Sequence, residues 1–179
     1  MKFIVLDISL TYQLMGKTDD PYSHFEGAIR NDAELIMDAK TKNNVQQLQS
    51  IALKQFYSAF YSGNYIEAAL FSKEAFSFPT SNTPKIQLIF HYFYHGLTSF
   101  WLYRDGQGES YLDDGKSVIK KMEVWCANSS CTFENKLFLL QAEHLASLCD
   151  KDASIEMYEM SIKTARDNGF LHEQGLGYG

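Results

Sequence analysis

The chain has 179 residues, which suits one compact domain or one segment of a longer repeat array. Hydrophobic residues make up 45% and aromatic residues 15%, enough to build a core and too many for a disordered chain. Because the formal net charge is −6, the chain lacks the basic surplus that nucleic acid and anionic membrane surfaces attract, and we expect neither as a partner.

The N-terminal stretch MKFIVLDISL carries one lysine and an apolar run interrupted by Asp7. That run is too short for a secretory signal peptide. The chain has three cysteines, an odd number, which in a chain without a secretion signal favours reduced thiols. We therefore expect a cytoplasmic protein whose residues 1–24 are irregular or partly helical.

Residues Gly16–Thr18 match the ending of a phosphate-binding loop, which makes demands on the residues around them. The loop needs a glycine five positions before Gly16, and that position holds Thr11. Its Lys-Thr pair should also open a helix whose N-terminus faces the phosphate. Instead Asp19–Pro21 follow at once, where two carboxylates repel phosphate and proline disfavours a helix. We expect a polar turn here and no nucleotide site.

The next part of the chain predicts three helices separated by short polar breaks. The first runs from about residue 26 to residue 40, and the second from about residue 45 to residue 62. The second ends at Gly63, a residue suited to the left-handed conformation that stops helices. The third begins at Tyr65 and is followed by a loop, FPTSNTP, with two prolines. Its expected inner face, at spacings of three and four, is Tyr65, Ala68, Ala69, Ser72, Ala75 and Phe76.

A fourth helix, residues 85–103, is strongly aromatic. Between Lys85 and Arg104 lie eighteen residues without a formal charge, a length that just reaches a membrane span. Five polar residues make the stretch a poor solute in lipid, and no second span would accompany it. We expect a buried central helix. The polar residues are Gln87, His91, His95, Thr98 and Ser99.

Three further helices are predicted toward the C-terminus. The fifth, about residues 110–126, has an apolar stripe of Val118, Met122 and Trp125 opposite charged residues. The sixth runs from residue 133 to residue 148, after the loop CANSSCT. The seventh has an expected buried stripe of Ile155, Tyr158, Ile162 and Ala165.

The last residues, 170–178, begin another helix that glycines weaken. With no further helix to cover it, this end should be the least protected part of the fold. We therefore expect it to be a surface for self-association or the junction to another domain.

Two of the expected hairpins resemble each other. The stretch YSGNYIEAALFSKEAF is similar to the tetratricopeptide consensus, with Gly63, Tyr65, Ala68 and Ala75 at matching places. LASLCDKDASIEMYEMSIKTA has the same pattern, with Ser154 and Ser161 in place of the alanines. Ala75 and Ser161 lie 86 residues apart, so one intervening hairpin gives a period of about 43 residues. We predict an all-α fold in which residues 1–179 form a single helical-repeat domain. Its antiparallel hairpins, from about residue 26 to residue 178, would stack as a tetratricopeptide-like α-solenoid.

Few residues have the spacing of a catalytic or metal site. His91 and His95 are four apart on one helix, but no carboxylate or thiol lies near them as a third ligand. Cys126 and Cys131 form a CxxxxC pair without the two further ligands that zinc needs, and Cys149 is distant. Nothing in the spacing indicates a base that would activate a thiol. We expect no catalytic, cofactor-binding or metal-binding residue and no enzyme activity.

Beyond these features, the chain from about residue 10 resembles one family segment. It is similar to the helical, tetratricopeptide-like region of large multidomain signalling proteins. Those proteins carry a serine/threonine-kinase-like domain, a predicted ATPase, this region, a GAF sensor and a histidine kinase. The matching stretches are GKTDDPYSHFEG, YSGNYIEAAL, HYFYHGLTSFWLY, VWCANSSCTFENKLFLLQAEHLASL and IEMYEMSIKTARDNGFLHEQGL.

The resemblance implies a non-catalytic scaffold or regulatory segment that links domains of a signalling ATPase and kinase. Its partners would be the other domains of that assembly, and the chain would be a fragment of a longer protein or the product of an eroded gene. The kinase motifs HRD and DFG and a complete Walker motif do not occur, so no catalytic residue of those domains is carried onto this chain. Two alternatives remain. The chain could be a free-standing adaptor that binds a peptide or helix of a partner, or an enzyme that uses histidine or cysteine residues.

The residues around Gly16–Thr18 predict that the chain does not bind nucleotide. Isothermal titration of the protein with Mg-ATP should give no saturable heat, because the loop lacks its first glycine and is followed by two carboxylates. Lys17→Ala should leave folding nearly unchanged. Micromolar ATP binding that disappears in Lys17→Ala would show that this interpretation is wrong.

Overall fold

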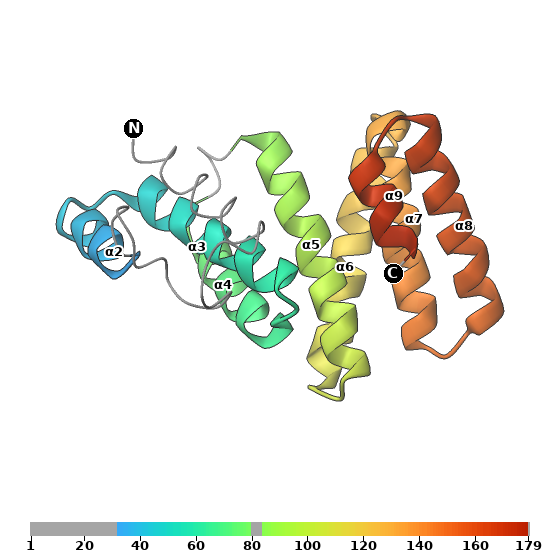
Figure 1. Ribbon diagram of the computed structural model, residues 1–179, viewed down its shortest axis with the longest axis horizontal. Helices are drawn as coiled ribbons and strands as arrows, with labels where there is room; N and C mark the ends of the chain where they lie inside the picture. Colours follow the sequence, from blue (N-terminus) through green and yellow to red (C-terminus); the bar gives the residue numbers. More distant parts are fainter. Residues whose placement is uncertain (1–31, 80–83, 179) are drawn as a thin grey trace. The chain divides into compact units, whose positions relative to one another are not determined.

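The structure is a computed structural model that describes residues 32–79 and 84–178, without the side chains of Asp32 and Cys131. The described residues form eight helices and no strand, which confirms the all-α class (Figure 1). The predicted turn at Gly16–Thr18, the segment 1–24, the start of the first helix and loop residues 80–83 lie outside them. The helices are α2 (Asp32–Thr41), α3 (Val45–Tyr61), α4 (Tyr65–Ser77), α5 (Lys85–Arg104), α6 (Glu109–Cys126), α7 (Ser130–Ser147), α8 (Lys151–Asp167) and α9 (Leu171–Tyr178).

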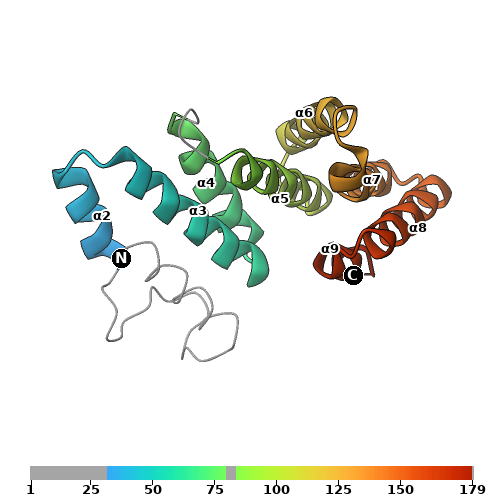
Figure 2. The same ribbon diagram turned by 90° about the horizontal axis from the view of Figure 1, so that it is seen from above.

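The helices belong to two compact units, with the boundary inside α5 between His91 and Tyr92. In the first unit α3 and α4 lie side by side as an antiparallel pair, and α2 packs against α3 (Figures 1 and 2). The centre of this unit is aromatic, because Phe56 is fully buried and its ring lies 5.2 Å from that of His91. Apolar burial of this kind is the main stabilising contribution to such a hairpin.

In the second unit each helix from α6 to α9 packs against the next, and α7 also contacts α9 (Figure 1). Two glycines bring the second half of α5 close to its neighbours. A Cβ at Gly96 would lie 2.7 Å from the Leu140 side chain, and a Cβ at Gly115 would lie 2.5 Å from the Phe100 ring. These separations exclude a methyl group, so the close packing of α5 against α6 and α7 depends on glycine at both positions.

The predicted central helix is buried over most of its second half. Phe93, Leu97 and Phe100 have no exposed surface. Thr98 and Ser99 are also buried, and each hydroxyl donates a hydrogen bond to the carbonyl four residues earlier. Bonding within the helix therefore satisfies these two polar groups. Burial explains the uncharged character of the stretch.

The α3–α4 and α7–α8 hairpins correspond at an offset of 86 residues. In the first, the Gln49 side chain donates to the Ala75 carbonyl at 3.5 Å. In the second, the corresponding positions are Asn135 and Ser161, and donor and acceptor are exchanged: the Ser161 hydroxyl donates to the Asn135 carbonyl at 2.8 Å. The predicted small residues are buried in both copies. They are Ala68 and Ala75 in α4, and Ser154 and Ser161 in α8.

The turns of these two hairpins also match. Gly63 (φ 75°) and Cys149 (φ 62°) both adopt the left-handed conformation after the first helix. The residues that follow, Asn64 and Asp150, cap the second helix, and each side chain accepts a backbone N–H three residues later at 3.3 Å. Glycine reaches the left-handed conformation without strain, whereas a residue with a Cβ does not.

The described helix boundaries agree with the predicted ones within one residue, except at the starts of α7 and α8; α8 begins at Lys151, inside the expected turn CDKD (149–152). Helix α7 begins at Ser130, three residues before the predicted start, so the loop is shorter than CANSSCT. The Ser129 hydroxyl donates to the Thr132 hydroxyl at 3.2 Å, which ties the residue before the helix to its first turn. Serine and threonine are frequent at helix starts, so Ser129 was a local signal for the earlier start that the prediction did not use.

The predicted inner face of α8 was wrong at one position and incomplete. Ile155 is 46% exposed, and Tyr158 and Ile162 are only half-buried. The buried residues of α8 are Ser154, Ser161 and Ala165. Small side chains on this face let α8 approach α7 closely enough for the Ser161 hydrogen bond, and larger side chains would hold the helices apart. By contrast, the predicted stripe of α6 is correct, with Val118 and Met122 buried and Trp125 half-buried.

The matched turns predict opposite effects of exchanging their left-handed residues. Cys149→Gly should raise the free energy of unfolding by about 1 kcal/mol, because it removes the strain of a Cβ at positive φ. The reciprocal change, Gly63→Cys, should lower it by a similar amount, since open space surrounds Gly63 and only the backbone conformation penalises a side chain. Urea unfolding followed by circular dichroism measures both, and a loss of stability in Cys149→Gly would contradict the prediction.

Candidate functional site

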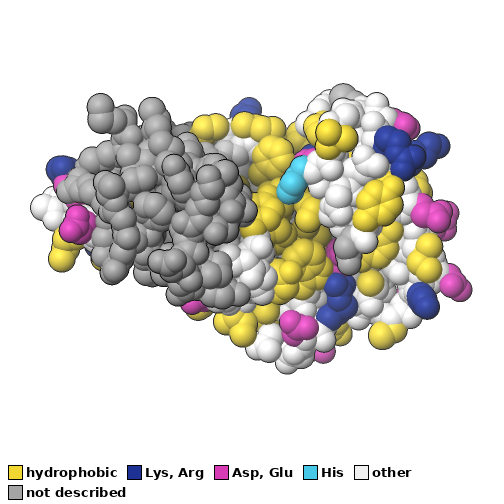
Figure 3. Space-filling view, viewed as in Figure 1, with side chains coloured by type: hydrophobic (Ala, Val, Ile, Leu, Met, Phe, Trp, Pro, Cys, Tyr) yellow, Lys and Arg dark blue, Asp and Glu magenta, His cyan; other side chains and the backbone are white. Residues whose placement is uncertain are grey.

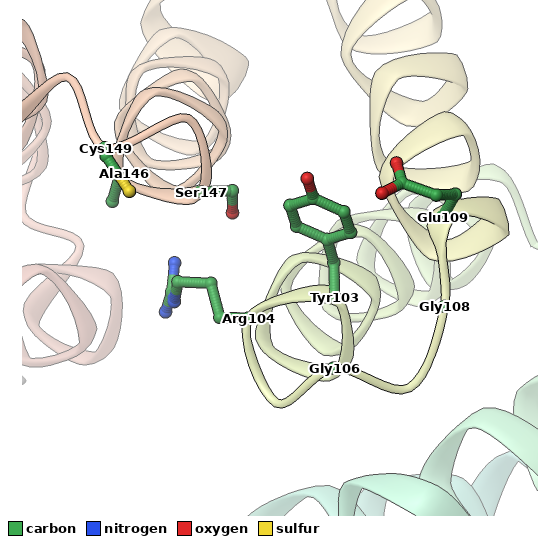
Figure 4. A pocket seen from close by; sticks show the side chains of 8 residues that line it. All are labelled: Tyr103, Arg104, Gly106, Gly108, Glu109, Ala146, Ser147 and Cys149. Atoms are coloured by element: carbon green, nitrogen blue, oxygen red, sulfur yellow. The ribbon is translucent and has the colours of Figure 1, made fainter.

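The candidate site is a pocket of about 510 Å³ in the second unit, which we call the helix-end pocket. Figure 4 shows Tyr103, Arg104 and Glu109 on one side, around the α5–α6 turn, and Ser147 on the other side at the end of α7. Its lining residues are Tyr103, Arg104, Gly106, Gly108, Glu109, Ala146, Ser147 and Cys149.

Local turn geometry explains why these side chains meet. Gly106 (φ 74°) ends α5 in the left-handed conformation, and Gly108 (φ 133°) allows the chain to turn into α6. On the other side, Cys149 ends α7 in the same conformation as Gly106. The C-terminal ends of α5 and α7 therefore both reach the pocket, together with the first residue of α6, Glu109.

Beside the pocket, a buried carboxylate connects three helices. Glu143 on α7 accepts a hydrogen bond from the Trp101 indole at 2.9 Å and pairs with the Arg104 guanidinium at 2.6 Å. The hydroxyl of Tyr158 on α8 also bonds to this carboxylate. The Glu143 side chain is 7% exposed and that of Arg104 is 34% exposed, so the charge pair lies between the interior and the pocket. A buried carboxylate is stable only with such a full set of partners.

This environment changes the acid–base behaviour of Tyr158. Burial raises the pKa of the Tyr158 phenol, the neighbouring Glu143 charge and hydrogen bond raise it further, and Arg104 partly opposes them. The phenol is therefore protonated at neutral pH and acts as the donor to Glu143. It is not poised to act as a base.

A second buried ion pair lies beneath α9. The Lys136 ammonium on α7 is 2.8 Å from a Glu173 carboxylate oxygen, with side-chain exposures of 2% and 6%. The same ammonium lies 4.5 Å from the centre of the Phe170 ring, a cation–π distance. Farther along, the Tyr94 hydroxyl and the His172 ring are 3.3 Å apart. These contacts hold the short α9 helix against the rest of the unit.

Sequence reasoning found neither ion pair. Lys136 and Glu143 share the inward face of α7 with Leu139 and Leu140, so two charges on an apolar face were the available signal. Such a signal does not identify the partners, because Arg104 is 39 residues from Glu143 and Glu173 is 37 residues from Lys136. The lining of the helix-end pocket was likewise not predicted, because it depends on where α5 and α7 end and where α6 begins.

The two histidines considered as metal ligands have different surroundings. His91 is buried, its Nε2 lies 3.0 Å from the Ser72 hydroxyl, and its ring stacks on Phe76 at 3.9 Å. Burial lowers the pKa of His95, while the Asp114 charge opposes that shift. His91 is thus a hydrogen-bonded histidine of the core, and His95 favours its neutral form.

Two cysteines, Cys126 and Cys149, have described side chains, and their surroundings differ. Burial raises the pKa of the Cys126 thiol, and the Glu134 charge raises it further, which favours the unreactive thiol form. Cys149 is exposed at the edge of the helix-end pocket. Within the described residues, no three His, Cys, Asp or Glu side chains are grouped as a metal site. Among the described helices, none has both the length and the apolar character needed to cross a bilayer.

Comparison with protein-family models, with curated proteins and with solved structures finds no match. The helix-end pocket offers an aromatic ring, hydroxyls, a carboxylate and a paired arginine, a set suited to holding a polar or charged group.

The Glu143 cluster predicts a large effect from a small change. Glu143→Gln should lower the free energy of unfolding by about 2–3 kcal/mol, because the neutral amide leaves Arg104 without its counter-charge and turns an NH₂ group toward other donors. The matched control is Glu159→Gln on the exposed side of α8, which should change stability by less than about 0.5 kcal/mol. Equal stability of the two variants in urea unfolding would contradict a structural role for the cluster.

Proposed function

We propose that the chain is a non-catalytic helical-repeat segment that binds protein, with hairpins arranged as a tetratricopeptide-like α-solenoid. The corresponding turns, caps and buried small residues of the α3–α4 and α7–α8 hairpins support a repeat. Its polar interior groups serve helix packing, as the bonds of Gln49 and Ser161 show. Repeat proteins of this kind use their surfaces to bind other proteins.

The observation that carries this proposal is a difference between the two corresponding outer faces. Ile66 and Leu70 on α4 are 55% and 63% exposed and lie four residues apart, on one side of the helix. At the offset of 86 residues, α8 has Asp152 and Glu156, which are exposed and charged. Figure 3 shows charged side chains distributed over the second unit, as is typical of a solvent-exposed surface. An apolar pair on α4, where its counterpart is charged, fits a surface that contacts another protein.

The resemblance of the five sequence stretches supports a more specific role. We propose that the segment is cytoplasmic and links or regulates domains of a signalling ATPase and kinase assembly. The runner-up is a free-standing adaptor that takes a peptide or helix of a partner, with the α4 face as a helix-docking surface. Self-association through the C-terminal end stays a prediction. An enzyme that uses histidine or cysteine has less support, given the packed His91 and the raised pKa of Cys126.

Exchanging the two outer faces tests the proposal. The double variant Ile66→Asp with Leu70→Glu gives α4 the residues of α8 and should preserve folding, because both positions are exposed. It should lower the affinity for amphipathic helical peptides, selected from a displayed library on the wild-type chain, at least tenfold. Fluorescence anisotropy measures the affinity, and the matched control is Asp152→Ala with Glu156→Ala on α8.

The control variant should bind the selected peptides as the wild type does. The proposed function would be wrong if the library gave no peptide that binds the wild-type chain. It would also be wrong if the α4 variant bound the peptides with unchanged affinity.

A further inference from the structure

The charge balance of the helix-end pocket indicates what kind of group it takes. The positive charge of Arg104 is matched by Glu143 at 2.6 Å, so the pair contributes little net charge. Glu109 also lines the pocket and is exposed to solvent. Arg104 and Glu109 are the charged lining residues, and because Glu143 beside the pocket neutralises Arg104, Glu109 leaves one net negative charge.

The helix termini act in the same direction. The last turns of α5 (20 residues) and α7 (18 residues) supply Tyr103, Arg104, Ala146 and Ser147 to the lining. The C-terminal end of a helix carries about half a negative elementary charge. The positive N-terminal end of α6 is also present, but the Glu109 carboxylate lies in the first turn of that helix and compensates for it. The α6 end offsets about half of the Glu109 charge, and the remainder adds to the two negative helix ends, which favours a cation.

The neutral lining groups suit a cation with an aliphatic stem. The Tyr103 ring can stack against a guanidinium or ammonium group, and the hydroxyls of Tyr103 and Ser147 have oxygen lone pairs that accept hydrogen bonds. Figure 4 shows the Tyr103 side chain extending from α5 toward the pocket. The volume of about 510 Å³ exceeds that of one side chain and leaves room for the backbone that carries it.

We propose that the helix-end pocket binds a lysine or arginine side chain of a partner protein. This inference rests on the proposed function as a protein-binding segment, and it specifies one contact with the partner, a cationic side chain in the helix-end pocket. A free polyamine shares the cationic chemistry, but it has no backbone to fill the remaining volume. The protein source is therefore favoured.

Nuclear magnetic resonance titration of the full chain tests the inference with three probes. They are a blocked Gly-Gly-Arg-Gly-Gly peptide, the same peptide with Glu in place of Arg, and spermidine. The arginine peptide should shift the backbone amide signals of Gly106, Gly108 and Ser147, and the glutamate peptide should not. Raising the salt concentration from low to high should weaken binding, as expected for charges near the surface.

Two pairs of variants identify the site. Glu109→Gln should weaken binding of the arginine peptide at least fivefold, whereas Glu123→Gln, at an exposed position of the same helix, should not. Ala146→Phe should block the pocket, whereas Ala153→Phe, a half-buried alanine that does not line it, should leave binding intact.

The inference is wrong if the glutamate peptide shifts the same amides or if Glu109→Gln binds like its control. It is also wrong if spermidine binds more tightly than the arginine peptide, since the ligand would then be a free amine. None of these results touches the proposed function, which rests on Ile66 and Leu70 of α4 and is tested separately. If the α4 variant loses binding of the helical peptides while the wild-type chain does not bind the arginine peptide, the proposed function stands and the inference about the pocket is wrong.

Discussion

The second unit depends on the buried carboxylate of Glu143. Removing a carboxylate from water costs several kcal/mol, and only good hydrogen bonds and an opposite charge offset that loss. Here Trp101, Arg104 and Tyr158 supply them from α5 and α8, so the register of three helices is set by one side chain. Because Arg104 is held against α7, the ends of α5 and α7 stay close. The helix-end pocket is a consequence of that arrangement.

Close helix packing supplies the remaining constraint. Gly96 and Gly115 allow approaches that a methyl group would block, and small residues on α4 and α8 do the same in the two hairpins. Once helices are this close, short polar side chains can reach a neighbouring backbone, as Ser161 reaches Asn135. Buried polar groups such as Gln49 and Ser161 are thus part of the packing, and hydrogen bonds compensate for their burial, whereas the buried side-chain amide of Asn135 has no such partner among the described residues.

Local signals made most of the helices predictable. Apolar spacing of three and four residues, together with Gly63 at a helix end, located seven of the eight described helices in order. The glycine-rich C-terminal end located the eighth. The inner face of α8 was harder, because Ile155 and Ser154 are neighbours and only packing against α7 decides which turns inward. The charges of Lys136 and Glu143 on an apolar face were a local signal for buried ion pairs but did not identify their partners, and the pocket had no local signal. Their members are brought together by tertiary contacts between residues far apart in the sequence.

The ion pair of Lys136 and Glu173 has a further consequence for how the C-terminal helix moves. With both charges almost fully removed from solvent, Glu173 cannot separate from Lys136 without leaving both charges unpaired until water reaches them. Positions in which the pair is broken but still buried are therefore high in free energy. Detachment of the first turn of α9 is consequently cooperative, because the two charges must regain water together. Residues 174–178 follow Glu173 in this eight-residue helix and include both of its glycines, so they can fray while the ion pair stays closed.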